Sequence, residues 1–335
     1  MTRRAWSWLA AATLLASALH AAIWFTATVR LEAAADARLR GLGEQGWKVG
    51  TGTPHHSGWP FQAVVTVPEV RVVHAASTLV LQTAAVRLTL SPRTPSRVTV
   101  ALDGPVVAAI DGEAAVPITF SRAEGRFTIV GPGDAEIVLR EVRGVFPEGP
   151  VALGRFDMHA IYNAAAEASQ DALAVEVTAG EIEFAGLLPL PATGLGTRIA
   201  LAELNFTLSG PIWLGLGNQR AVAAAWRDGG GRLSIARLAA QWGRLDLDLQ
   251  ATIGLDARLQ PEGRGTLGAG GVSELLDRMV GEGLVPPSSA RAIKAVISMM
   301  PKTPDGQVSV PAVLQNGTVT VARFPMARMP LVRWQ

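Results

Sequence analysis

Residues 245 to 259 alternate strictly between apolar and polar side chains. The larger apolar members of this run are Leu245, Leu247, Leu249, Ile253, Leu255 and Leu259. Because successive side chains of a β-strand point to opposite faces of the sheet, the pattern predicts a strand with one apolar face and one wet face. The run is longer than the usual strand of about 5 to 6 residues, so we expect a bend or a break at Gly254 that keeps the alternation.

The same alternation recurs through most of the chain after Trp47. Segments such as FQAVVTV, TLVLQTAAVRLTL and RIALAELNFTLSG are separated by turn residues, as is typical of successive antiparallel strands. A short helix is expected at 218–226, and two amphipathic helical segments form an insertion at 271–300. The sequence therefore predicts a mainly β domain over residues 47–335: an extended, curved antiparallel sheet, groove-like or half-barrel, with two short helices near the C-terminus.

The N-terminus carries an uncharged segment from Trp6 to Val29, preceded by Arg3 and Arg4. At about 1.5 Å per residue this segment is long enough to cross the hydrocarbon core of a bilayer, about 30 Å, as one helix. Residues 1–30 are therefore predicted to form a cytoplasmic stub and a transmembrane anchor, followed by a helical stalk at 31–46. The alternative is a signal peptide that is cleaved near Ala18.

Under either interpretation, the rest of the chain lies outside the cytoplasm. Hydrophobic residues make up 49% of the sequence and charged residues 17%, against about 25% charged in an average soluble protein. We expect a single-pass protein of the bacterial inner membrane, with a cytoplasmic N-terminus and a periplasmic body. The net charge of +2 predicts no nucleic-acid partner, and the absence of cysteine excludes thiol and zinc-thiolate chemistry.

Sequence motifs for catalysis or cofactor binding are weak. The strings GLGEQG (41–46) and GRGTLG (263–268) match a dinucleotide-binding pattern, but the first follows a helical segment. No parallel strand with a ribose-binding acid follows the second. His55 and His56 are adjacent in a predicted strand, so their side chains face opposite ways and cannot easily share a metal ion. We predict no cofactor and no metal ion.

Three aspartates, Asp246, Asp248 and Asp256, lie on the polar side of the alternating run. The first two would lie about 6.5 to 7 Å apart along one face of a strand, which suits a pair of carboxylates in acid-base chemistry. The positions around them on that face are polar, so a solvated sheet face is the preferred interpretation. A hydrolase that uses these three carboxylates is the alternative.

Several stretches resemble one known family: LEAAADARLRGLGEQGWKV, HHSGWPF, AAWRDGGGRLSI, QWGRLDLDLQATIGLDARLQPEG and LQNGTVTVARFPMARMPLVRW. Together they are similar to the uncharacterised alphaproteobacterial family known as domain of unknown function 2125, from the anchor to Trp334. The residues that carry this likeness are Trp59, Pro60, Trp226, Gly229, Gly230, Trp242, Gly243, Asp256, Pro261 and Gly263. These are turn and edge positions, so the resemblance implies no catalytic residue.

A looser resemblance links NGTVTVARFPMARMP and LQPEG to AsmA-like envelope proteins, whose long sheets are associated with phospholipid movement or outer-membrane assembly. We therefore expect a non-enzymatic protein that binds or handles lipid, or supports envelope maintenance, through an apolar sheet face. Its expected partners are the inner membrane, through the N-terminal helix, and phospholipid or envelope proteins. The alternative is a structural or assembly partner in the cell envelope without a ligand.

Overall fold

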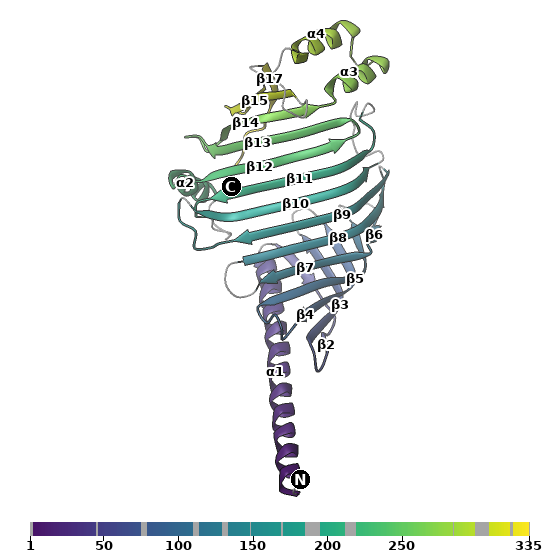
Figure 1. Cartoon of the computed structure of the whole chain (residues 1–335), viewed down its shortest axis with the longest axis vertical. Coiled ribbons are helices and arrows are strands. Elements are labelled where there is room, and N and C mark those ends of the chain that lie inside the picture. Colours follow the sequence, from purple (N-terminus) through teal and green to yellow (C-terminus); the bar gives the residue numbers. More distant parts are fainter. Residues whose placement is uncertain are drawn as a thin grey trace. The chain divides into compact units, whose positions relative to one another are not determined.

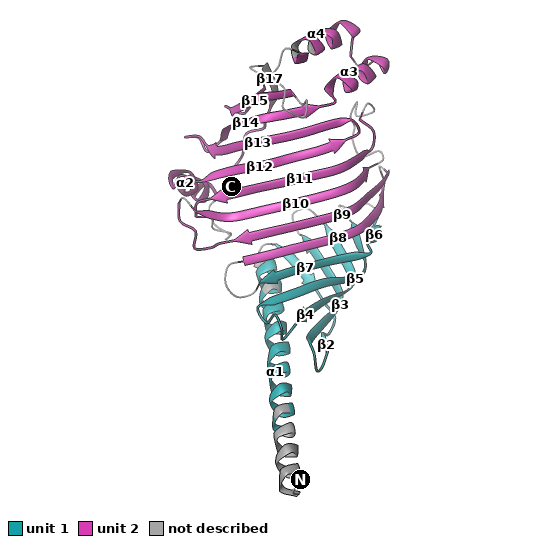
Figure 2. Cartoon of the chain, in the orientation of Figure 1, with its two compact units in different colours: residues 1–131 teal, residues 132–335 magenta. Residues whose placement is uncertain are grey.

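The computed structural model of the chain describes residues 3–44, 46–74, 79–109, 114–128, 133–147, 149–168, 170–184, 195–211, 219–283, 285–298, 308–321 and 324–334. Within these ranges it describes all side chains except those of residues 3–14, 16, 38, 44, 292, 293, 296 and 324–327. The chain divides into two compact units, residues 1–131 and 132–335 (Figure 2). Strands dominate both units, which confirms the predicted mainly β fold.

The described part of the first unit consists of one long helix and a set of antiparallel strands (Figure 1). These elements are α1 (Arg3–Glu44), β1 (Trp47–Gly50), β2 (His55–Ser57), β3 (Ala63–His74), β4 (Val80–Leu90), β5 (Arg97–Ala109), β6 (Val116–Ile118) and β7 (Arg122–Thr128). The strand β3 pairs with β1, β2 and β4. The sheet continues from β4 to β5, which pairs with both β6 and β7.

The core of the first unit forms where α1 packs on one face of this sheet. Leu31 of α1 clusters with Val65, Val67 and Val98, and all four side chains are buried. Val65 and Val67 are two residues apart in β3, so their side chains point to the same face. Val65 has an exposed fraction of 0%. The helix therefore closes the part of this face around Val65 against water, whereas Leu88 and Leu90 beside it stay partly buried.

The structure leaves the predicted transmembrane anchor unconfirmed. The helix α1 has 42 residues, which corresponds to roughly 63 Å of length. Among the described residues, however, no helix combines the length and the apolar character that crossing a bilayer requires. The predicted anchor, 6–29, lies partly outside the described side chains.

The second unit is an antiparallel meander in which each strand pairs with the next one, from β8–β9 through to β16–β17. Its strands are β8 (Gly133–Phe146), β9 (Gly149–Tyr162), β10 (Asp171–Phe184), β11 (Arg198–Ser209), β12 (Arg232–Trp242), β13 (Leu245–Leu255), β14 (Pro261–Gly270), β15 (Val308–Gln315), β16 (Thr318–Val321) and β17 (Phe324–Arg328). The hairpin pattern that turn residues predict is therefore confirmed in this unit.

Three short helices interrupt the meander in the part of this unit that the structure describes. α2 (Gln219–Asp228) covers most of the helix predicted at 218–226. α3 (Val272–Gly281) and α4 (Pro287–Ser298) occupy the insertion predicted at 271–300. The amphipathic spacing of these segments therefore predicts the helices correctly.

The strand predicted to continue to Leu259 ends earlier. β13 stops at Leu255, because the Asp256 carboxylate accepts hydrogen bonds from the backbone N–H groups of Arg258 (2.7 Å) and Gln260 (2.8 Å). These bonds close a turn between β13 and β14, as Asp side chains commonly do. Gly254, where we expected the bend, lies inside β13 and pairs with β14.

Four adjacent strands of the second unit each carry one extra residue, and these residues lie side by side. We call them the bulge line: Glu141 in β8, Gly154 in β9, Glu181 in β10 and Ala200 in β11. In a regular strand, residues three positions apart point to opposite faces. Ala179 and Ile182, on either side of Glu181, nevertheless point to the same face of the sheet. Such bulges bend a sheet and increase its twist. Glu141 and Glu181 adopt left-handed backbone angles, with φ of 51° and 55°.

We expect Glu181→Gly to leave the free energy of unfolding unchanged or to raise it by up to about 1 kcal/mol, because glycine adopts a left-handed φ without a Cβ clash. Glu181→Val should lower it by about 1 to 2 kcal/mol, since a β-branched side chain is strained there. Chemical denaturation of both variants checks this. Valine favours strands in general, so a valine variant more stable than the glycine variant would contradict the bulge.

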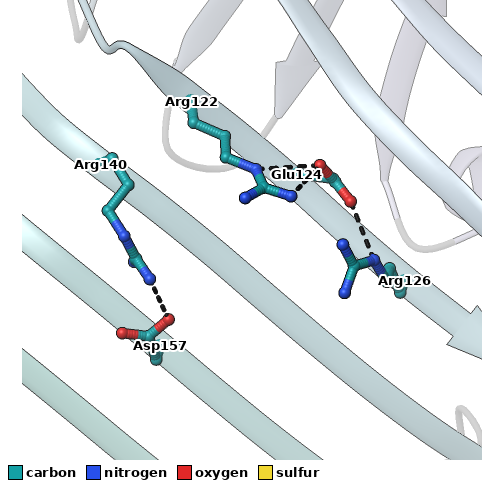
Figure 3. A network of polar contacts seen from close by, with 5 residues as sticks. All are labelled: Arg122, Glu124, Arg126, Arg140 and Asp157. Atoms are coloured by element: carbon teal, nitrogen blue, oxygen red, sulfur yellow. Dashed lines mark hydrogen bonds and ion pairs between the residues drawn. The ribbon is translucent and has the colours of Figure 1, made fainter.

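One charged cluster of the first unit is held within a single strand. Glu124 of β7 accepts hydrogen bonds from Arg122 (2.7 and 3.0 Å) and from Arg126 (2.9 Å), as Figure 3 shows. The Glu124 side chain is 18% exposed. Burial by itself raises the pKa of Glu124, but the hydrogen bonds and positive charges of Arg122 and Arg126 outweigh it. The pKa of this carboxyl group is therefore lowered from its usual value.

Replacing Glu124 by glutamine should destabilise the protein by about 1 kcal/mol at neutral pH. Because the pKa is lower in the folded protein, ionised Glu124 stabilises it above the unfolded pKa of about 4.3. This contribution is lost as the pH falls through the folded pKa. Denaturation of wild type and E124Q should therefore give free energies that converge below about pH 4. A difference that is equal at neutral and acidic pH is the contrary result.

Candidate functional site

The strand β13 places its apolar side chains opposite apolar side chains on both neighbouring strands. Leu249 lies opposite Leu238 of β12 and Leu267 of β14. Directly opposite residues of an antiparallel pair point to the same face and touch. The alternating pattern of one strand therefore becomes part of a surface that several strands share.

This surface consists of three rows that cross the second unit from β8 to β14, and we call it the apolar face. The central row is Ile137, Met158, Val177, Leu204, Leu238, Leu249 and Leu267, and it reaches β15 at Val310. One flanking row is Leu139, Phe156, Ala179, Ala202, Ala240, Leu247 and Ala269. The other is Ala135, Ala160, Val175, Phe206, Ile235, Ala251 and Gly265. None of these residues carries a charge.

The opposite face of the same strands carries charged side chains. Arg237 of β12 reaches Glu203 of β11 at 3.2 Å and Asp248 of β13 at 3.3 Å. Arg140 of β8 donates to Asp157 of β9 at 2.6 Å (Figure 3). These ion pairs are partly exposed, so each contributes at most about 1 kcal/mol. They mark this face as the one that water solvates.

The apolar face is only half-buried. Every member of the three rows is half-buried except Leu238, which is 41% exposed, and Val310, which is buried. The closed sheet face of the first unit differs, because Val65 there is completely buried beneath α1. A covering layer normally buries the inward side chains of a sheet. Among the residues that the structure describes, no such layer lies over most of the apolar face.

The described helices of the second unit pack at its margins. α2 packs against β13, and Arg227 donates to the carbonyl oxygens of Asp256 (3.3 Å) and Ala257 (3.1 Å) in the β13–β14 turn. α3 and α4 pack against each other, and Lys294 pairs with Asp277 at 2.6 Å. Figure 1 shows α2 beside the strand ends and α3 and α4 beyond β14. This placement agrees with the half-exposed apolar rows.

Most of the apolar residues predicted from the alternating run share the β13 face. Leu245, Leu247, Leu249, Ile253 and Leu255 all belong to β13 and are half-buried. Leu259 does not join them, because it lies in the β13–β14 turn with φ of 62° and is buried. The Trp334 indole donates to the Leu259 carbonyl oxygen at 2.8 Å. The turn at Asp256 is the physical reason for this correction.

The three aspartates of the same run lie in different surroundings. Asp246 is exposed on the polar face, and Asp248 is held by Arg237. Asp256 caps the β13–β14 turn through backbone N–H groups. Among the described residues, no three His, Asp or Glu side chains gather closely enough to hold a metal ion. The geometry gives Asp248 and Asp256 partners that stabilise the sheet and its turn.

Trp226, Gly229 and Gly230 lie where α2 ends. The Trp226 indole donates to the Ser209 carbonyl oxygen at 2.7 Å. A Cβ at Gly231 would lie 2.3 Å from the Trp226 ring, so only glycine fits beneath it. Gly230 has φ of 77°, which suits the left-handed residue that often ends a helix. These residues connect β11 to β12 through the helix.

The remaining residues of the family likeness in this unit also lie at close backbone approaches. Trp242 and Gly243 begin the hairpin between β12 and β13, and the Trp242 indole donates to the Gly196 carbonyl oxygen at 2.8 Å. Pro261 begins β14 opposite Leu255. A Cβ at Gly263 would lie 2.3 Å from the Thr252 carbonyl oxygen. The string at 263–268 is therefore part of a strand, which does not form a phosphate-binding loop.

The HHSGWPF stretch forms β2 and a turn that packs on α1. The Trp59 ring lies 5.0 Å from the His20 ring and 5.8 Å from the Trp24 ring, measured between centroids. The Trp59–Pro60 peptide bond is cis. Nε2 of His56 lies 3.1 Å from a carboxylate oxygen of Glu32 on α1. His55 pairs with Thr66 of β3 through the backbone.

Sequence patterns identified one strand of the apolar face but missed the rest of it. The residues on β8 to β12 alternate as well, yet the bulge line and a bulge in β12 between Ile235 and Leu238 interrupt that alternation. The signal was present as breaks in the alternation, for example the run Leu-Arg-Glu-Val at 139–142. Such a break also arises in loops, so it does not identify a bulge by itself.

No curated protein and no solved structure matches the chain, and the looser likeness to AsmA-like proteins is not shown. The family described as an uncharacterized protein conserved in bacteria, DUF2125, matches residues 24–330. This range includes most of both units and all ten residues that carry the resemblance. The protein therefore belongs to the DUF2125 family.

Proposed function

We propose that this protein is anchored in the bacterial inner membrane, lies mainly in the periplasm, and binds the acyl chains of lipids along the apolar face of its second unit. The observation that carries this proposal is the set of three uncharged rows that stay half-buried from β8 to β14. In the same proposal the bulge line curves the sheet into a groove-like form with the apolar face inside.

The size of the apolar face supports a ligand. Strands lie about 4.8 Å apart and rows about 7 Å apart, so three rows across seven or eight strands cover roughly 800 Å². The largest apolar patch on a typical monomeric protein is about 300 to 600 Å² and is often functional. An apolar area of this size favours contact with something other than water, because burial contributes about 25 cal/mol per Å².

The chemistry of the face supports acyl chains as that ligand. Its rows are mostly aliphatic, with Phe156 and Phe206 as the aromatic members. Acyl chains present no hydrogen-bonding groups, so a face without polar side chains loses nothing by binding them. Protein interfaces usually combine an apolar centre with about one hydrogen bond per 100 to 200 Å². The rows of the apolar face offer no side-chain donors or acceptors for such bonds.

The N-terminal sequence supports the membrane attachment. The segment 6–29 is uncharged and follows two arginines, which favours a cytoplasmic N-terminus. A protein that this segment anchors in the membrane is close to a supply of its proposed ligand, phospholipid.

A photoreactive benzoylphenylalanine at Leu238, the most exposed member of the central row, tests the proposal in cells. We expect crosslinking to phospholipid at this position, detected as a lipid-sized mass increase. The matched control is Ser234, which lies in the same strand on the opposite face and pairs with Thr207 and Thr252. A protein adduct at Leu238 would support an envelope assembly partner or a second copy instead, and the absence of any adduct would also contradict lipid binding.

Leu238→Gln should weaken phospholipid binding by about tenfold, because a buried amide without a partner costs about 1 to 3 kcal/mol. The lipid that copurifies with the full-length protein, measured by extraction and mass spectrometry, checks this. Ser234→Gln adds a similar side chain to the polar face and should leave the lipid content unchanged. Equal losses in both variants would indicate a general loss of folding and would count against the proposal.

A further inference from the structure

The turn from Gly58 to Gln62 is fixed to α1 by two side-chain hydrogen bonds. Nε2 of His20 lies 2.6 Å from the Pro60 carbonyl oxygen, which accepts the bond. The Trp24 indole donates to the Gln62 carbonyl oxygen at 2.5 Å. Both helix residues lie within the uncharged segment 6–29. The turn therefore lies level with the C-terminal part of that segment.

Several backbone polar groups of this turn have hydrogen-bond partners within the protein. The Gly58 carbonyl oxygen accepts from the N–H groups of Phe61 (3.0 Å) and Gln62 (2.9 Å). Pro60 has no N–H, and the carbonyl oxygens of Pro60 and Gln62 accept from α1. A turn in water does not need this arrangement, because water supplies the partners. In a bilayer each unsatisfied backbone group costs several kcal/mol.

The side chains of the turn are apolar and exposed. Trp59 is 49% exposed and Phe61 is 79% exposed. On α1, the neighbouring turns of the helix carry Leu19, 62% exposed, and Ile23, 56% exposed. Two elements that are far apart in the sequence therefore present large apolar side chains at one level. We call these four side chains the exposed patch, and exposed apolar side chains that gather in this way often mark an interaction site.

Along α1, charged side chains lie away from this level. On α1 the first charges after the patch are Arg30 and Glu32. Glu32 is 12 positions from His20 in the sequence, or about 18 Å along the helix axis. Trp side chains favour the boundary between headgroups and acyl chains, with charges on the water side. The order of patch and charges along α1 matches that boundary.

We propose that the 58–62 turn is a second membrane contact, which inserts Trp59 and Phe61 into the outer boundary of the bilayer that α1 crosses. This inference rests on the membrane attachment in the proposed function. The turn leads directly into β3, whose first residues Ala63 and Val65 are buried in the sheet. The contact therefore fixes the orientation and height of the first unit's sheet above the membrane, in addition to its attachment.

The absence of cysteine from the chain makes a direct test practical. Single cysteines at Phe61, Leu19 and Gln82 of the full-length protein are labelled with the fluorophore NBD. The protein is reconstituted into vesicles of phosphatidylcholine and phosphatidylglycerol that contain nitroxide lipids, with the nitroxide either at the headgroup or deep in the acyl chain. Gln82 is the matched control, because it is exposed on β4 about 26 Å along the strand from the end that pairs with Ala63.

We expect the label at Phe61 to shift its emission to shorter wavelengths and to be quenched more by the shallow nitroxide than by the deep one. The label at Leu19 should be quenched by both, and the label at Gln82 by neither. Quenching at Leu19 without quenching at Phe61 would overturn the second contact and leave the anchor intact. Quenching at neither position would overturn the membrane attachment itself, and equal quenching at Phe61 and Gln82 would show that contact is not specific to the turn.

Discussion

The second unit depends on the register of its antiparallel pairs. Side chains alternate with a period of two, so a slip of one residue in one strand would move all of its apolar side chains to the wet face. From β8 to β14 the pairing keeps each apolar row intact. The bulge line preserves this register, because four adjacent strands each contain an extra residue at matching positions. Apolar residues beyond the bulge line, such as Ile182 and Ile199, therefore stay on the same face as the rows.

The apolar sheet faces of the two units differ in how far a helix covers them. In the first, α1 lies on the sheet and Leu31 packs against Val65, so that face is closed. In the second, the described helices lie at the margins and the rows stay half-buried. The same strand pattern thus yields a sealed core in one case and an accessible surface in the other. This difference, more than any single residue, is the basis for the proposed binding of lipid.

The alternation from Leu245 to Leu255 was predictable because a strand that is wet on one face has a simple pattern. The end of that strand was not, since the capping bonds of Asp256 depend on a backbone turn that many Asp residues do not make. The left-handed Glu141 and Glu181 could not be predicted either, because glutamate has no preference for that conformation. Contacts such as His20 with Pro60 join residues 40 positions apart, and no local pattern reports them.

The accessibility of the central row to a water-soluble reagent tests the open apolar face most directly. Leu204→Cys and Val65→Cys each place one cysteine in the full-length protein purified in detergent, the first in the central row and the second in the buried core of the first unit. When the phospholipid on the apolar face has been removed, which extraction and mass spectrometry check, a maleimide should modify the cysteine at 204 in the native protein and the cysteine at 65 only on unfolding. Equally slow modification at both positions in this lipid-free protein would show that the apolar face is closed, which contradicts lipid binding on it.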